Sequence, residues 1–76
     1  MLINATQCRM ARAALRLSVR KLAAMAKVAT DTITRLEADK ELKPRTVEAV
    51  QRCLEAAGIE FTNGDAPGVR LKKKSR

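Results

Sequence analysis

The side chains best suited to recognising another molecule lie together between Thr30 and Thr34. Small polar residues dominate this stretch: Thr30, Asp31, Thr32 and Thr34. When such residues occupy the exposed N-terminal end of a helix, they can meet the base edges of the DNA major groove, which is wide enough to admit one helix. A generic helical hairpin shows the same periodicity, so this stretch alone leaves both interpretations open.

Two short helices joined by a tight connection are expected to position these side chains. Ser18 is a good N-cap for the first helix, because its hydroxyl can accept a hydrogen bond from a free backbone N–H. Both helices carry apolar residues at three-to-four spacing, which predicts a buried stripe. The stripe consists of Leu22, Ala23 and Ala26 in the first helix and of Ile33 and Leu36 in the second.

The sequence predicts one further helix on each side of this pair. The residues up to Asn4 are expected to form a short arm, and Asn4 or Thr6 caps a helix that ends near Leu15. The last helix runs from about Pro44 to Ala57, because proline suits a first helical turn, where its missing N–H costs nothing.

Two short alternating segments, residues 59–61 and 69–71, flank a stretch rich in turn formers and predict a β-hairpin. A symmetric register pairs Ile59 with Leu71, Glu60 with Arg70 and Phe61 with Val69. The apolar residues then share one face. A lone two-stranded hairpin is marginal in water, so this face must pack on the helices or on another subunit. Residues 72–76 are expected to form a basic tail.

Composition limits the class of protein. The chain has 76 residues, which suits one small domain. Its net charge of +8 comes from 16 Lys plus Arg against 8 Asp plus Glu, spread along the chain. This charge favours a polyanionic partner, and nucleic acid over a membrane, because no predicted helix combines a basic face with a bulky apolar one. A solvated cationic surface that aids solubility is the alternative.

Neither catalysis nor metal binding is expected. The chain has no histidine and no CxxC motif, and Cys8 and Cys53 lie on separate predicted helices. We expect free thiols in a reducing cytoplasm rather than a disulfide. Without a Gly-rich phosphate loop or a nucleophile–base constellation, we expect no enzyme and no cofactor. No signal peptide or membrane-spanning segment is expected either.

Arg12, Leu15, the segment from Ser18 to Glu37 and the helix at Pro44 together resemble the Cro/CI-type helix-turn-helix family, also called the XRE family of bacterial and phage regulators. The segments SVRKLAAMA (18–26) and TITRLE (32–37) are especially similar. The resemblance implies a mainly α fold, a small four-helix lambda-repressor-like helix-turn-helix domain over residues 1–58. The hairpin, residues 59–71, is a possible dimerisation element.

The resemblance also implies a recognition helix from about Ala29 to Ala38. Its base-contacting residues would be Thr30, Asp31, Thr32, Thr34 and Arg35. Arg35 is the leading candidate, because a guanidinium can bind guanine O6 and N7 bidentately. Asp31 has three alternative roles: it accepts a hydrogen bond from a cytosine amino group, orients Arg35, or caps its own helix.

Other positions are implied to contact phosphate or to hold the domain together. The phosphate-contacting residues would be Ser18, Val19, Lys40, Lys43 and Arg45. Such contacts position a protein on DNA and carry no sequence information directly. Arg12 and Glu37 match a structural pair that ties the first helix to the end of the recognition helix.

The sequence departs from the family pattern at the joints between helices. Lys27 and Asp39 stand where many members carry glycine, so Lys27 is expected either to adopt a left-handed conformation or to alter the turn. Ala29 replaces the usual Ser or Thr cap, a role that Thr30 or Asp31 would take over. Val19 stands where many members carry a phosphate-contacting glutamine.

These features predict a sequence-specific double-stranded DNA-binding regulator, most simply a repressor that binds an inverted repeat as a homodimer in the bacterial cytoplasm. The alternative is an antitoxin-like or accessory protein that binds a partner protein and its own promoter. The dimer or partner interface would then be the apolar face of the hairpin: Ile59, Phe61, Val69 and Leu71. RNA binding has weak support, because Phe61 is the one aromatic residue that could stack on a base.

Overall fold

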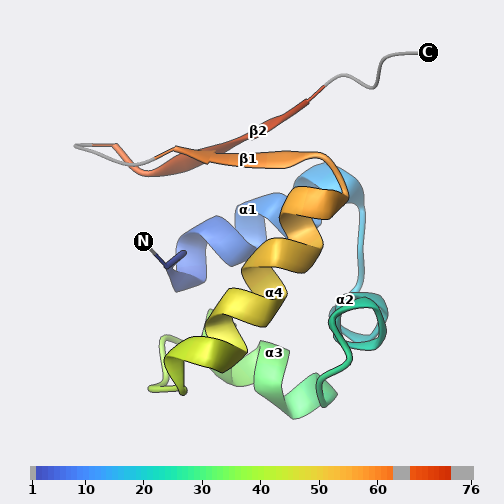
Figure 1. Ribbon diagram of the computed structural model, residues 1–76, viewed down its shortest axis with the longest axis vertical. Coiled ribbons are helices and arrows are strands. Elements are labelled where there is room, and N and C mark those ends of the chain that lie inside the picture. The colour runs from blue at the N-terminus through green and yellow to red at the C-terminus, as the bar shows by residue number, and fades with distance from the viewer. Residues whose placement is uncertain (1, 63–65, 73–76) are drawn as a thin grey trace.

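The computed structural model describes residues 2–62 and 66–72 of the chain. It has the expected mainly helical fold, with four helices followed by an antiparallel hairpin (Figure 1). The helices are α1 (Ala5–Leu15), α2 (Val19–Ala26), α3 (Thr30–Glu37) and α4 (Pro44–Ala56), and the strands are β1 (Ile59–Thr62) and β2 (Gly68–Leu71). Met1, residues 63–65 of the expected turn and residues 73–76 of the expected tail lie outside the described residues.

Helix α1 begins at a reciprocal capping box. The Asn4 side-chain oxygen accepts a hydrogen bond from the Gln7 N–H (2.8 Å), and Gln7 Oε1 accepts one from the Asn4 N–H (3.1 Å). Asn4 is therefore the cap, and the alternative, Thr6, lies inside the helix. At the other end, Arg16 adopts a left-handed conformation with φ 57° and its N–H bonds back to the last turn. This geometry satisfies helix-end carbonyls that would otherwise lack partners.

Helices α2 and α3 are joined by residues 27–29. The Ser18 hydroxyl caps α2 by accepting a hydrogen bond from the Lys21 N–H (3.0 Å). Lys27 ends α2 with φ 60°, the left-handed alternative expected where glycine is absent. Helix α3 follows Ala29 without a side-chain cap. The expectation that Thr30 or Asp31 would supply this cap is therefore wrong, because both lie within the first helical turn.

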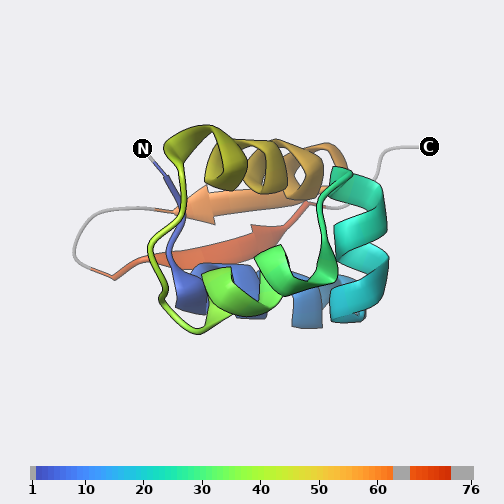
Figure 2. The ribbon, with the colours of Figure 1, turned by 90° about the horizontal axis from the view of Figure 1, so that it is seen from below.

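The hairpin has the predicted register. Ile59 pairs with Leu71, Glu60 with Arg70 and Phe61 with Val69, and a further pair joins Thr62 to Gly68. Strand β1 packs on α4 and strand β2 on α1, so the hairpin lies across the end of the helical body (Figures 1 and 2). The apolar face of the hairpin was expected to pack either on the helices or on another subunit. The helices of the same chain cover at least part of it.

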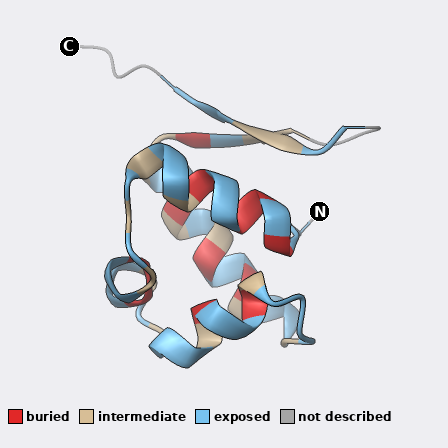
Figure 3. Ribbon diagram, turned by 180° about the vertical axis from the view of Figure 1, so that it is seen from behind, coloured by how far each residue is buried: buried red, intermediate tan, exposed pale blue. Residues whose placement is uncertain are grey.

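The core lies where the helices converge beneath the hairpin (Figure 3). Its largest fully buried side chains are Cys8, Leu22, Ile33, Val50, Leu54 and Ile59. Ile3 also belongs to the core, and its N–H donates to Gln51 Oε1 (3.1 Å), so the expected N-terminal arm is tied to α4 rather than free. No helix in the described part of the chain is long and apolar enough to cross a membrane.

Gln7 joins α1 to the hairpin, a contact that the sequence did not reveal. Its side chain is buried, and Nε2 donates to the Thr62 carbonyl (2.9 Å) and to the Gly68 carbonyl (3.2 Å). Because these two carbonyls belong to paired strand residues, one amide holds both strands against α1. A buried amide without such partners would cost about 1–3 kcal/mol.

Candidate nucleic-acid interface

Helix α3 lies at the end of the molecule opposite the hairpin (Figure 1), and the view from that end places it in front (Figure 2). Ile33 and Leu36 are buried and attach the helix to the body, mainly against α1 and α2. Thr30, Asp31, Thr34 and Arg35 face solvent. This placement leaves one long side of α3 open to a large partner.

The predicted base-contacting residues divide into two groups. Thr30, Asp31, Thr34 and Arg35 are all exposed, and their one- and four-residue spacing places them on one side of α3. Thr32 is half-buried, since it lies nearer the side that packs on the body. The structure therefore brings four of the five predicted residues together and sets Thr32 apart.

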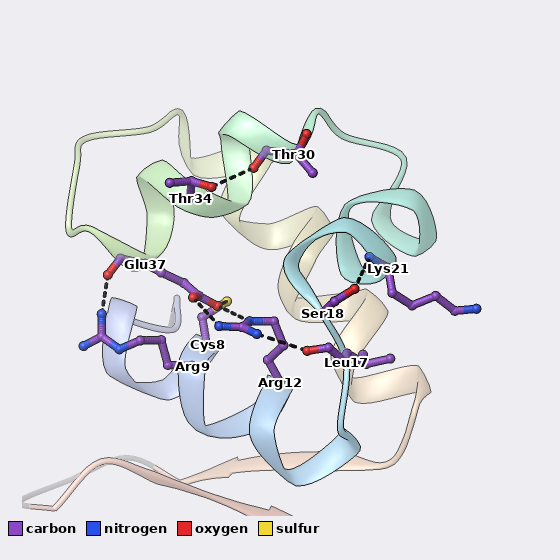
Figure 4. A network of polar contacts seen from close by, with 9 residues as sticks. All are labelled: Cys8, Arg9, Arg12, Leu17, Ser18, Lys21, Thr30, Thr34 and Glu37. Atoms are coloured by element: carbon purple, nitrogen blue, oxygen red, sulfur yellow. Dashed lines mark hydrogen bonds and ion pairs between the residues drawn. The ribbon is translucent and has the colours of Figure 1, made fainter.

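Two contacts organise this exposed side. The Thr34 hydroxyl donates to the Thr30 carbonyl (3.2 Å), which directs that hydroxyl along the helix (Figure 4). Asp31 Oδ2 lies 4.0 Å from a terminal nitrogen of Arg35, and the side chains of both remain mostly exposed. Asp31 therefore faces Arg35 instead of capping the helix. The Thr30 and Arg35 side chains keep polar groups that can reach a ligand.

The C-terminal end of α3 is held by the predicted pair of Arg12 and Glu37 (Figure 4). Arg12 Nε lies 2.8 Å from Glu37 Oε2 and Arg12 NH2 lies 2.9 Å from Oε1, so the contact is bidentate. The third guanidinium nitrogen donates to the Leu17 carbonyl (3.1 Å) just before α2. One arginine thus connects α1, the start of α2 and the end of α3.

Two further residues join this cluster. The Arg9 guanidinium donates to the Glu37 backbone carbonyl, and the Cys8 thiol donates to Glu37 Oε2 (3.4 Å). Arg9 lies one helical turn before Arg12, so the arginine spacing in α1 was the sequence signal for its position. Nothing in the local sequence indicated that the thiol of Cys8 would bond to a carboxylate.

Burial and charge in this cluster shift the pKa values of Cys8 and Glu37. Burial, followed by the Glu37 charge and hydrogen bond, raises the pKa of the Cys8 thiol to about 12. Burial alone would raise the pKa of Glu37, but hydrogen bonds from Arg12 and Cys8 and the charges of Arg12 and Arg9 outweigh it and lower that pKa. At neutral pH the thiol is therefore protonated and Glu37 is ionised.

The predicted phosphate-contacting residues differ in their exposure. Ser18, Lys40, Lys43 and Arg45 are exposed, whereas Val19 is half-buried and packs against the core. Lys40 follows α3, and Lys43 and Arg45 lie at the start of α4. The Val19 side chain is therefore structural, and only its backbone could meet a phosphate.

The predicted dimer or partner surface is largely used within the protomer. Ile59 is 2% exposed and belongs to the core, and Phe61 and Val69 are half-buried against it. Leu71 is 54% exposed, the largest exposure among the sizeable apolar residues of the described chain. Leu71 is therefore the member of this set with most surface left for another molecule.

Comparisons with known proteins add no family assignment. No protein-family model matches the chain, and no curated protein matches it. The Cro/CI-type resemblance therefore stays a prediction carried by the residues themselves. Among the described residues, no group of histidine, cysteine, aspartate or glutamate side chains could hold a metal ion.

Proposed function

We propose that this chain is a sequence-specific double-stranded DNA-binding regulator, most simply a repressor that acts as a homodimer on an inverted repeat. The observation that carries the proposal is the exposed side of α3, where Thr30, Asp31, Thr34 and Arg35 lie together at one end of the molecule. An exposed polar side of a helix suits major-groove reading, because a recognition helix lies in the groove with its exposed side chains at the base edges.

The surrounding charge supports the same proposal. Lys40, Lys43 and Arg45 are exposed and follow α3 directly in the chain, where they can neutralise backbone phosphates. The Arg12–Glu37 contact also supports the proposal. It holds α3 in a fixed orientation, which a helix that reads bases needs. Under this proposal the chain catalyses no reaction. It acts in the cytoplasm of a bacterium, where bacterial DNA is found.

The test is selection from a pool of random duplex DNA, followed by sequencing, at two salt concentrations. We expect an enriched inverted repeat whose half-sites lie about one helical turn apart and which survives the higher salt. Purely electrostatic binding falls steeply with salt and enriches no sequence. That second outcome would overturn the proposal.

A second candidate is an antitoxin-like or accessory protein that binds a partner protein. Two exposed apolar side chains favour it: Leu71 on β2, and Met10 on α1, which is 39% exposed. The Met10 methyl lies near Gly68, the first residue of β2, so both side chains border the same strand. Independent folding of a soluble dimer with no partner present would count against this candidate.

A further inference from the structure

Asp31 is the one acidic residue on the exposed side of α3. The other acid of this helix, Glu37, is turned inward and bound by Arg12. A carboxylate on a surface that meets DNA is repelled by phosphates, since two like charges a few ångströms apart disfavour each other even near water. Its presence on this side of the helix therefore needs an explanation.

The structure narrows the three roles that the sequence left open for Asp31. Helix α3 starts at Ala29 without a side-chain cap, so Asp31 does not cap it. Its carboxylate instead lies 4.0 Å from the Arg35 guanidinium, with side-chain exposures of 78% for Asp31 and 55% for Arg35. The acid precedes the base by four residues, which is the favourable order for such a pair on a helix.

We propose that Asp31 is a specificity-determining positioning residue, which acts on DNA through Arg35. An unrestrained arginine side chain can swing to the nearest phosphate, a contact that is the same for every sequence. By attracting the guanidinium across the face of α3, Asp31 favours the orientation that reaches base edges. Its charge also weakens binding to DNA on which Arg35 finds no guanine. This inference rests on the proposed function.

The test compares two charge-neutralising substitutions, Asp31→Asn and Glu60→Gln. Glu60 is the matched control, because it also forms an exposed ion pair, with Arg70 at 3.8 Å, but on the hairpin at the opposite end of the molecule. Both variants raise the net charge by one. Affinity is measured for the duplex selected by the wild-type protein and for a random duplex, at the same salt concentration.

We expect Asp31→Asn to bind random duplex about twofold more tightly and to lower the ratio of selected to random affinity by about twofold to fivefold. Glu60→Gln should change both affinities together and leave this ratio intact. In an Arg35→Ala background, Asp31→Asn should lower the ratio no further, because the effect passes through Arg35. A contribution of Asp31 to helix stability alone would move the melting temperature and not this ratio.

The outcomes separate this inference from the proposed function. If the wild-type protein selects no sequence, the proposed function itself fails. If the wild-type protein selects a sequence but Asp31→Asn keeps the full ratio, Arg35 does not depend on Asp31. If Asp31→Asn lowers the ratio equally with and without Arg35, the carboxylate acts directly on DNA, and the positioning role is wrong.

Discussion

The two ends of α3 differ in almost every physical property. At the C-terminal end, Glu37 is 9% exposed in its side chain and receives hydrogen bonds from Arg12 and Cys8. At the N-terminal end, Ala29 provides no cap and Thr30 and Asp31 are exposed, and Arg35, in the last turn, is exposed on the same side of the helix as Asp31. Glu37 therefore fixes the C-terminal end to the body, and the side of the helix that carries Thr30, Asp31 and Arg35 faces solvent.

This difference separates the residues that hold the helix from those that could read a ligand. Changes at the anchored end are expected to alter folding stability, and changes on the exposed side are expected to alter binding. Ile33 and Leu36 belong with the anchored group, because they are buried although they lie between the exposed residues. The following predictions test how complete the separation is.

The largest effect is expected from Arg12→Met, which keeps much of the apolar stem but removes the charge. It leaves the Glu37 carboxylate buried without its main partner, a kind of change that costs about 3–5 kcal/mol in a fully buried pair. Since the Arg12 side chain is 25% exposed, we expect a loss of about 2–3 kcal/mol, measured by urea unfolding.

Arg52→Met is the matched control for this measurement. Arg52 also pairs with a glutamate, Glu48, at 2.9 Å, but its side chain is 75% exposed. Exposed pairs contribute less than about 1 kcal/mol, so this variant should unfold almost like the wild type. Equal losses from both arginines would contradict the view that the end of α3 is specially anchored.

Arg35→Ala should weaken DNA binding and leave folding stability nearly unchanged, the opposite of what is expected for Arg12→Met. It is expected to cost about 1–3 kcal/mol of binding free energy on the selected duplex and to relax the preference at one base pair. Folding stability should change by less than about 0.5 kcal/mol, because Arg35 is exposed. Competition binding against single-base variants of the duplex measures the first quantity, and urea unfolding measures the second.

Lys43→Ala shows how the loss of a phosphate contact affects binding, so that the effect of Arg35→Ala can be assigned to a base or to a phosphate. Lys43 is exposed at the start of α4, and its predicted contact is with phosphate. We expect weaker binding to all duplexes alike, with the salt slope reduced by about one. If Arg35→Ala behaves in the same way, Arg35 contacts phosphate and the assignment of base reading to the exposed side of α3 is wrong.

Acidic pH should reduce the contribution of the Arg12–Glu37 pair to folding stability. The pKa of Glu37 is lower in the folded chain than its unfolded value of about 4.3, so its contribution to stability is complete above that value. The contribution is lost as the pH falls through the lower, folded pKa. We therefore expect the stability gap between wild type and Arg12→Met to narrow as the pH falls below about 4.3. A constant gap would show that Glu37 ionisation is not the cause.

The smallest effect is expected at the turn before α3. Lys27 has φ 60°, a conformation that costs a side-chain-bearing residue about 1–2 kcal/mol. Lys27→Gly removes this cost but increases the freedom of the unfolded chain, so we expect a net gain of about 0.5–1 kcal/mol in thermal unfolding. The selected DNA sequence should not change, because the face of α3 is untouched.

Much of the fold followed from local patterns. The hairpin register was predicted because alternating apolar residues, one charge pair and the turn formers all favoured the same alignment, and it is confirmed. Pro44 indicated the start of α4 correctly. The start of α3 was harder, because its cap is Ala29, which carries no polar side chain to mark the boundary.

The contacts that fix α3 and the hairpin were less visible in the sequence. The Arg12–Glu37 pair came from family resemblance, because residues that far apart in sequence share no local periodicity. Gln7 was missed entirely, since one amide that bonds to strand carbonyls far along the chain leaves no repeating signal. Among the candidate site residues, the run of small polar side chains indicated an exposed face at Thr30, Asp31, Thr32 and Thr34, and the resemblance added Arg35. All of these are exposed except Thr32, which is half-buried.

The Gln7 amide also has a consequence for how the protein is made. Its partner carbonyl at Gly68 lies 61 residues further along the chain. Because a chain is synthesised from its N-terminus, this bond cannot form until Gly68 has left the ribosome. Helix α1 and the hairpin are therefore joined only after all the residues between them have been synthesised, and until then the Gln7 amide is hydrogen-bonded to water.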